Sequence, residues 1–315
     1  EVTGEYVNGS GAAAYKALSN SGNPFGSKAN LSFSGSGDTD FGTASWFMFT
    51  NDGQTGVSSH SVTLDMGDMG LVGFDQGTGA FGVGTIDDKT PTAYEEIWNG
   101  TTQTNGDILD GNGGSSGVFG YKNTIMGMNL NVEYAPSVAS ADAGDGAVGG
   151  VVTQPDGTSL NFAITNNTMV EGLDFGVGYG ETSYDLPSTN VATGDTESTV
   201  GYANYSFGPV TIGTTQSYTS GSVNASGVNI GANEVAIYGV AFNVNDNLSV
   251  SYNDYENKYL KRGSQGDVTQ DMDGVQIAYT VGGATLRISD ASVTNAGGTT
   301  GNSEDRTEVS LLMAF

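Results

Sequence analysis

The sequence contains no cysteine and a single histidine, His60. Without cysteine, neither a disulfide framework nor a thiolate metal site can form. Basic residues are also scarce, because nine lysines and arginines stand against 35 aspartates and glutamates, which gives a formal net charge of -26. A surface with this charge repels phosphate groups, so the composition argues against nucleic acid as a partner.

Long hydrophobic runs are missing too, and no stretch approaches the roughly 18 apolar residues that a membrane-spanning helix needs. A membrane-spanning β-strand needs only about ten residues of alternating polarity, so the sequence is still compatible with a transmembrane β-barrel. What the sequence has in abundance is glycine, with 50 residues, together with 15 tyrosines and 13 phenylalanines. Glycine is a poor helix former and aromatic residues favour strands, so we expect an all-β protein.

Polar and apolar residues alternate along about sixteen segments. In residues 25–35, for example, Ala29, Leu31 and Phe33 share one face. Tight connections such as Gly282-Gly283 alternate with connections of about ten residues or more. Short turns at one end and long loops at the other are typical of transmembrane barrels. We therefore predict a single antiparallel β-barrel domain over residues 1–315.

The free-energy cost of placing a charged side chain in lipid indicates which face of one predicted strand points outward. If Leu286 and Ile288 point outward, Arg287 points into the lumen; the opposite register would place Arg287 in lipid at a cost of about 2–4 kcal/mol near the midplane. A soluble β-sandwich also produces one polar and one apolar face per strand. The asymmetry of loop lengths and the aromatic residues near strand ends favour the membrane barrel over the sandwich.

Residues 76–117 follow neither a helical nor a strand period. They contain one base, Lys89, and six acids, which are Asp87, Asp88, Glu95, Glu96, Asp107 and Asp110. Structureless loops of this length usually have a function. Thr92 to Glu95 has capping-box spacing and Pro91 suits a helix start, which predicts a short helix over residues 91–98.

The first residues of this loop, Gly77 to Gly82, match the dinucleotide fingerprint G-x-G-x-x-G. The fingerprint works only where its third glycine enters a helix of a βαβ unit. Because Val83-Gly84-Thr85 follows and no crossover helix is predicted, we reject this motif and expect that no cofactor is required. Asp107 and Asp110 have a spacing that could hold Ca²⁺, but the final glutamate of an EF-hand is missing, so calcium stays an open possibility.

Catalytic motifs are not found. No G-x-S-x-G elbow and no cluster of metal ligands occurs, and His60 lies in a polar connection where solvation or a subunit contact is favoured over general-base catalysis. We therefore expect that the protein is not an enzyme.

The chain resembles the trimeric general-diffusion porins of Gram-negative outer membranes. The features it shares are an opening strand at Glu1-Val2, a long acidic loop after residues 71–75 and a closing alternating strand that ends in Phe315. The resemblance covers essentially the whole chain and implies a transmembrane barrel of about 16 strands, a third loop folded into the lumen, a homotrimer and a bacterial outer-membrane location. It also implies that Phe315 is the assembly signal. Porins of this type carry arginine clusters on early strands, whereas here the early bases are only Lys16 and Lys28.

These features predict a water-filled channel for passive diffusion of ions and small hydrophilic solutes. The expected constriction places Asp87, Asp88, Glu95, Glu96 and Asp107 on the loop opposite Lys28, Lys122 and Arg287 on the wall. Since the screening length at physiological salt is about 8 Å, fixed acids in a narrow pore bias every passing ion. We expect a weak cation preference. The alternative is a secreted, acidic, calcium-stabilised adhesin or surface-layer β protein, although no fixed repeat supports a solenoid.

Overall fold

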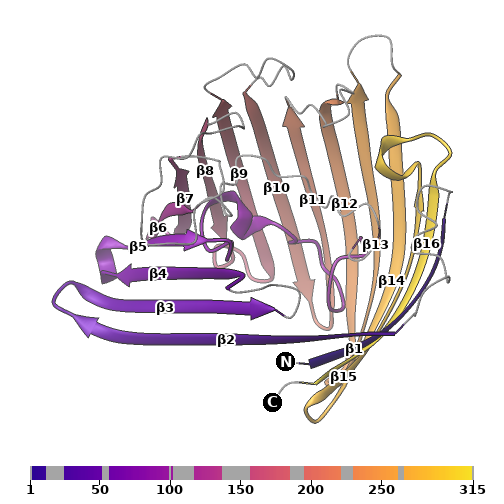
Figure 1. Cartoon of the computed structure of the whole chain (residues 1–315), viewed down its shortest axis with the longest axis horizontal. Coiled ribbons are helices and arrows are strands. Elements are labelled where there is room, and N and C mark those ends of the chain that lie inside the picture. Colours follow the sequence, from indigo (N-terminus) through magenta and orange to yellow (C-terminus); the bar gives the residue numbers. More distant parts are fainter. Residues whose placement is uncertain are drawn as a thin grey trace.

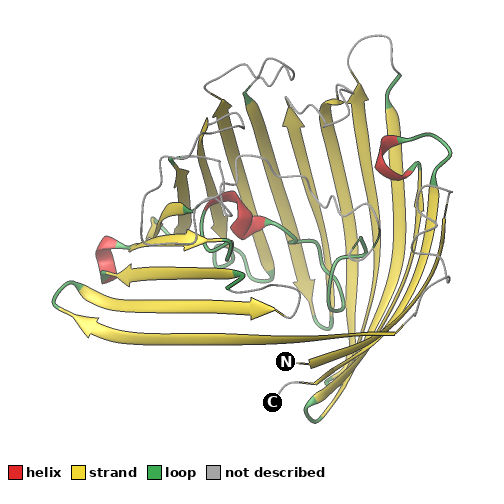
Figure 2. Cartoon of the chain, viewed as in Figure 1, coloured by secondary structure: helices red, strands yellow, loops and turns green. Residues whose placement is uncertain are grey.

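The computed structural model consists almost entirely of β-strands and loops (Figure 2). It describes residues 2–11, 25–51, 57–98, 101, 117–136, 157–184, 195–220, 230–261 and 266–313. The strands are β1 (Val2–Gly11), β2 (Phe25–Thr39), β3 (Gly42–Asn51), β4 (Ser59–Asp65), β5 (Leu71–Gln76), β6 (Val118–Ile125), β7 (Met128–Ala135), β8 (Gly157–Asn166), β9 (Leu173–Tyr184), β10 (Thr196–Phe207), β11 (Val210–Ser220), β12 (Ile230–Asn245), β13 (Leu248–Lys261), β14 (Val268–Val281), β15 (Ala284–Thr294) and β16 (Ser303–Met313). Three short 3-10 helices are described: η2 (Gly67–Met69), η3 (Gly82–Ile86) and η5 (Ala296–Gly298). In this part of the chain no helix has the length and apolar character needed to cross a membrane.

The sheet is a closed antiparallel barrel. Each strand pairs with its neighbours in sequence, and β1 pairs both with β2 and with β16. Closure leaves no free edge whose backbone groups would lack partners, which is a requirement for strands inside a bilayer. Figure 1 shows β8 to β14 as a curved wall, with β2 to β5 on the other side of the enclosed space. The predicted fold class is confirmed.

The tight turns lie at one end of the barrel. Phe207 pairs with Val210 and Val281 pairs with Ala284, so each of these turns has a two-residue tip. Gly208 and Gly282 occupy these tips with φ of 58° and 60°, a backbone region that glycine enters without steric cost. The longer connections, such as residues 136–156, leave from the opposite ends of the strands. The predicted asymmetry of loop lengths is therefore present.

The two faces of the sheet are reversed relative to a soluble protein. Along β14, Val275 and Ile277 are 50% and 40% exposed, whereas the inward Gln270 and Gln276 are buried. The same alternation on β16 exposes Leu311 and buries Glu308. A sandwich would bury the apolar face, but here the apolar face is the accessible one. This pattern excludes the soluble β-sandwich and is typical of strands surrounded by lipid.

The helix predicted over residues 91–98 is wrong. These residues form bends and turns, and the helical turn in this loop is η3, which lies earlier. The wall explains the difference, because Asn253 Nδ2 donates to the Pro91 carbonyl at 3.0 Å and the Ala93 N–H donates to Ser251 Oγ at 2.9 Å. Backbone groups that are bonded by the barrel have no need of helical partners.

Candidate pore constriction

The described part of the long loop, residues 77–98, lies along the inward face of the barrel. Its contacts follow the order of the strands: Phe81 with Gly120 of β6, Val83 with Asn161 of β8, Lys89 with Asn204 of β10, Thr90 with Thr215 of β11, Pro91 with Asn253 of β13 and Tyr94 with Arg287 of β15. Figure 1 shows this segment after β5, inside the space that the strands enclose. The loop is thus attached to the wall over most of its described length.

Glycines on the inward face make room for the apolar side chains of the loop. A Cβ atom would lie 1.9 Å from Phe81 Cγ at Gly120, 2.8 Å from Ile86 Cδ1 at Gly178 and 2.9 Å from Ile97 Cγ2 at Gly274. These separations are too short for any side chain, so the three loop residues pack directly on the strand backbone. Glycine inside a strand often marks such a close approach.

Two buried clusters attach the loop at separate places. The first joins Val83 and Ile86 of η3 to the wall residues Ala163, Val200 and Tyr202. The second contains Ile97 and Trp98 from the end of the segment and Val235, Ile237, Tyr255, Met272, Val293 and Ala296. The rings of Trp98 and Tyr255 have centroids 5.5 Å apart. Burial of this apolar area holds the acids between the two clusters in place.

The glycine-rich motif that opens the loop wraps around a carboxylate. Asp75 accepts from the N–H of Thr78 at 3.3 Å and from the N–H of Ala80 at 3.2 Å, and the Thr78 hydroxyl also donates to it. The Gly82 N–H donates to Asn131 Oδ1 at 3.0 Å. Side chains of the protein therefore occupy these backbone donors, which a nucleotide phosphate would need.

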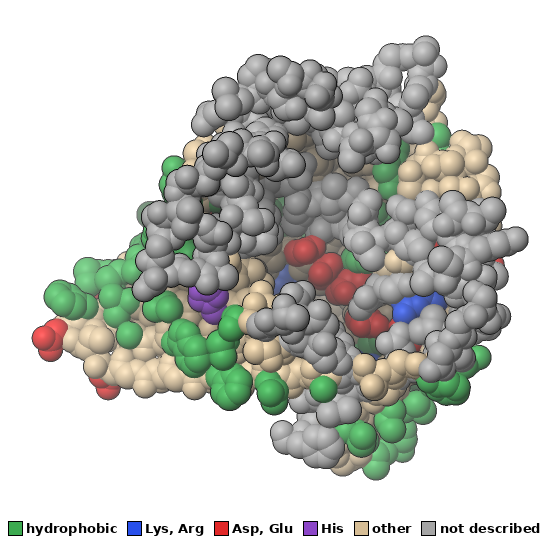
Figure 3. Space-filling model, viewed as in Figure 1, with side chains coloured by type: hydrophobic (Ala, Val, Ile, Leu, Met, Phe, Trp, Pro, Cys, Tyr) green, Lys and Arg blue, Asp and Glu red, His purple; other side chains and the backbone are tan. Residues whose placement is uncertain are grey.

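Three acids of the loop influence one another electrostatically. Loss of solvent in the lumen, and then the carboxylates of Asp87 and Glu96, raise the pKa of Asp88 from 3.8 to about 8. Burial also raises the pKa of Glu96, with a further contribution from Asp87. Asp88 has φ of 55°, a left-handed conformation that Asp and Asn tolerate better than most residues. Figure 3 shows acidic side chains side by side in the central hollow of the molecule.

Glu95 lies apart from this group, beside Tyr94. Burial, followed by the charges of Glu95 and Glu308, raises the pKa of Tyr94. The neighbouring Glu96 interacts instead with Asp87 and Asp88. The two adjacent glutamates therefore act in different surroundings, although no helix separates them.

Two of the expected wall bases, Lys122 and Arg287, point into the barrel. Lys122 lies on the inward face of β6, with Nζ 5.2 Å from the ring centroid of Phe81. Arg287 also points inward, and its Cζ lies 5.2 Å from the ring centroid of Tyr94. Both bases therefore contact aromatic side chains of the loop itself.

The remaining predicted residues can be placed only in part. Lys28 lies on β2 and pairs with Thr3 of β1, but its side chain is outside the described part of the structure. Asp107, Asp110 and Phe315 also lie outside the described residues. Among the residues that are described, no group of three Asp, Glu or His side chains is arranged to hold a metal ion.

Sequence reasoning missed an ion pair on the last strand. Arg306 and Glu308 both point inward from β16, and their side chains meet at 2.6 Å with 11% and 9% exposure. The alternation of β16 already places both residues on one face, but it gives no sign of their pairing. Arg306 is therefore a third base on the wall near the end of the described loop segment.

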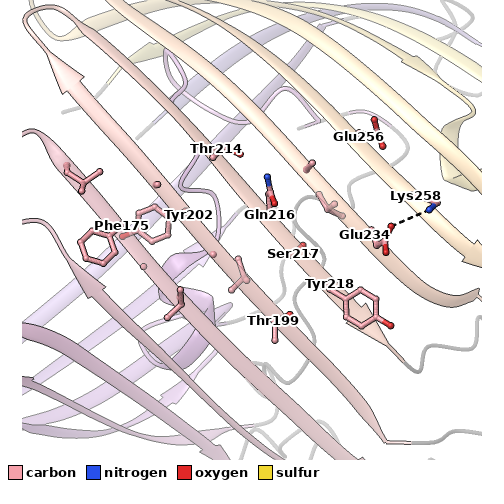
Figure 4. Close-up of a pocket in the computed structure, with 18 residues that line it drawn as sticks. Phe175, Thr199, Tyr202, Thr214, Gln216, Ser217, Tyr218, Glu234, Glu256 and Lys258 are labelled. Carbon is pink, nitrogen blue, oxygen red and sulfur yellow. Dashed lines mark hydrogen bonds and ion pairs between the residues drawn. The ribbon is translucent and has the colours of Figure 1, made fainter.

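The outer face carries two further features. His60 of β4 lies beside Phe74, with ring centroids 6.3 Å apart, and Phe74 lies beside Phe119. A groove of about 1060 Å³ runs over β9 to β13 (Figure 4). Its polar end holds Lys258 and Glu234, 3.5 Å apart. On these strands the loop contacts the opposite face, so the groove is separate from the lumen.

No family model matches the sequence, and no curated protein sequence is significantly similar to it. Solved structures do match over nearly the full length. OmpF of Salmonella typhi in complex with daunomycin has a TM-score of 0.59 and 12% identity, and the match covers 99% of this chain and 97% of that chain.

Two more matches have similar quality. OmpT of Vibrio cholerae in its trimer form has a TM-score of 0.62 and 12% identity, with 98% of each chain covered. The anion-selective porin of Comamonas acidovorans has a TM-score of 0.61 and 15% identity, with 100% of this chain and 99% of that chain covered. At such identities the likeness concerns the fold. The chain has the β-barrel fold of the bacterial porins.

Proposed function

We propose that the protein is a porin of the bacterial outer membrane, a water-filled channel through which ions and small hydrophilic solutes diffuse passively. The observation that carries the proposal is the loop segment 77–98, which lies along the polar inward face of a closed barrel whose outward face is apolar. A channel of this kind needs no catalytic group and no cofactor. Stepwise conductance in a planar bilayer tests it.

The loop narrows the channel, and its charge gives the channel a cation preference. Asp87, Asp88, Glu95 and Glu96 lie on the segment that enters the barrel. One of the inward bases is neutralised by a partner, since Arg306 pairs with Glu308. Low-dielectric walls preserve the field of fixed charges in a narrow pore, so the acids concentrate cations there.

The outer face suits both lipid and a second subunit. The exposed apolar residues of β13 to β16 match the hydrocarbon core of a bilayer. On β4, the imidazole of His60 is better accommodated at a protein contact than in lipid, and it lies beside Phe74, which in turn lies beside Phe119. We place a homotrimer contact at β4 to β6, consistent with the trimer form of the OmpT structure.

The cation preference should depend on pH. Because the pKa of Asp88 is raised to about 8, this carboxyl is mostly protonated at neutral pH and gains its charge above that pH. We therefore expect the reversal potential in a KCl gradient to show a stronger cation preference at pH 9 than at pH 6 (roughly one unit or more on either side of the pKa). Reversal potentials in planar bilayers measure the change.

Asp88→Asn is the matched variant, because asparagine tolerates the positive φ and cannot ionise. It should remove the step near pH 8 while the channel continues to conduct. A step of the same size in D88N would assign the pH dependence to another group.

A further inference from the structure

A second cavity lies between the loop and the end of the barrel that carries the tight turns. Its volume is about 840 Å³, which is within the range of small-molecule sites. The loop contributes Thr85 and Lys89. The wall contributes Lys122, Asp174 and other residues that lie within a few positions of the short turns. A solute that has passed the loop from the long-loop side therefore enters this cavity next.

Two lysines open onto the cavity, and neither forms an ion pair with a carboxylate of the residues described. The ion pairs between described residues are Lys258 with Glu234 and Arg306 with Glu308. Neither Lys89 nor Lys122 takes part in them, although the charge of Lys89 acts on Asp88 and the charge of Asp75 acts on Lys122. The backbone at Lys89 is fixed, because its carbonyl accepts from Asn204 Nδ2 at 2.6 Å, and Lys122 is held against Phe81. In a chain of charge -26, two lysine side chains at one cavity therefore offer donors to an anionic group.

Acids line the same cavity. Asp65 accepts from the Gly67 N–H at 2.9 Å, and Asp174 accepts from the Tyr202 hydroxyl at 2.8 Å, while Asp68 lies on η2. Each of these bonds uses one oxygen, so the carboxylates keep acceptor capacity for an ammonium group. A simple anion would meet repulsion from these acids, and a simple cation would meet repulsion from the lysines. A solute that carries both charges matches both sets.

We propose that this cavity is a binding site for small zwitterionic solutes of the amino acid class. The carboxylate of the solute lies at Lys89 and Lys122, and its ammonium group lies toward Asp65 and Asp174. The site rests on the proposed channel function and gives it a preferred substrate class. Transient binding beside the constriction raises the residence of these solutes in the channel without closing it.

Current blockade in planar bilayers tests the proposal with three probes of similar size. L-glutamine carries both charges, N-acetyl-L-glutamine lacks the ammonium group and L-glutaminamide lacks the carboxylate. For the wild-type protein, glutamine should block half of the current at a concentration about tenfold lower than either analogue, which corresponds to about 1.4 kcal/mol. In K89Q/K122Q the advantage of glutamine over glutaminamide should disappear, and in K89R/K122R it should return.

Lys258→Gln is the control, because Lys258 lies on the outer face in the groove of Figure 4 and should leave the blockade unchanged. Stepwise conductance by the wild-type protein establishes the channel, so a missing channel contradicts the proposed function and not the site alone. If the channel conducts but N-acetylglutamine blocks as well as glutamine, or K89Q/K122Q behaves like the wild type, the zwitterion site is wrong.

Discussion

The variant D87N/D88N/E96Q is expected to lose the cation preference of the channel. These three carboxylates interact with one another in the described part of the loop, and together they supply most of its fixed negative charge. Fixed charges in narrow, low-dielectric spaces change local ion concentrations by about tenfold or more. At a pH of about 9, where Asp88 is ionised, we therefore expect the ratio of cation to anion permeability to fall several-fold. The reversal potential in a KCl gradient reports it directly.

The matched control is E234Q/E256Q, which removes acids from the outer face of β12 and β13. It changes the net charge of the protein in the same direction without touching the loop. We expect its selectivity to equal that of the wild type. If the outer-face variant lowered the cation preference as much as the loop variant, the selectivity would arise from the overall charge and not from the constriction.

Gly120→Ala is expected to displace the beginning of the loop from the wall. The new Cβ would lie 1.9 Å from Phe81 Cγ, and the ring cannot share that space. Overpacking of this kind costs about 1–3 kcal/mol, measured as a loss in the free energy of unfolding. Because the ring is part of the loop, its displacement should also raise the single-channel conductance and the current noise.

A double-mutant cycle separates this contact from a general effect on the strand. In G120A/F81A the added methyl group occupies space that the ring has left, so the two changes should compensate by about 0.5–3 kcal/mol. Gly35→Ala is the control on another strand, since no atom lies within 4 Å of its added Cβ. Strict additivity of G120A and F81A would show that the two residues are not in contact.

The strands could be predicted from the sequence because their outward side chains face lipid and their inward side chains face the water-filled lumen, which produces a two-residue alternation of polarity. A one-residue shift of β15 would move Arg287 to the lipid face and Leu286 to the lumen, and the cost of the shift determines the register. The structure places Arg287 inward, against Tyr94. The same reasoning failed for residues 91–98, where the capping signal is local but the hydrogen-bond partners, Ser251 and Asn253, lie far away in sequence.

The packing of the loop against the wall could not be predicted from the sequence, although glycines inside strands are a signal for it. Gly120, Gly178 and Gly274 occur in strands where a side chain is expected, and each meets an apolar residue of the loop. In a chain with 50 glycines, the sequence does not distinguish these three from the turn glycines. Likewise, nothing in the spacing of Lys122 and Arg287 shows that both bases lie against rings of the loop.

The most direct test of the proposed channel is a recording of the purified protein in a planar lipid bilayer with a KCl gradient. A passive channel gives stepwise increases of current, one for each inserted channel unit, and its acidic loop gives a reversal potential on the side of cation preference. If the protein inserts no channels, or if it remains monodisperse in water without detergent, the proposed function as a membrane channel is wrong. Stepwise channels with anion preference would leave the pore intact but contradict the role of the acidic loop.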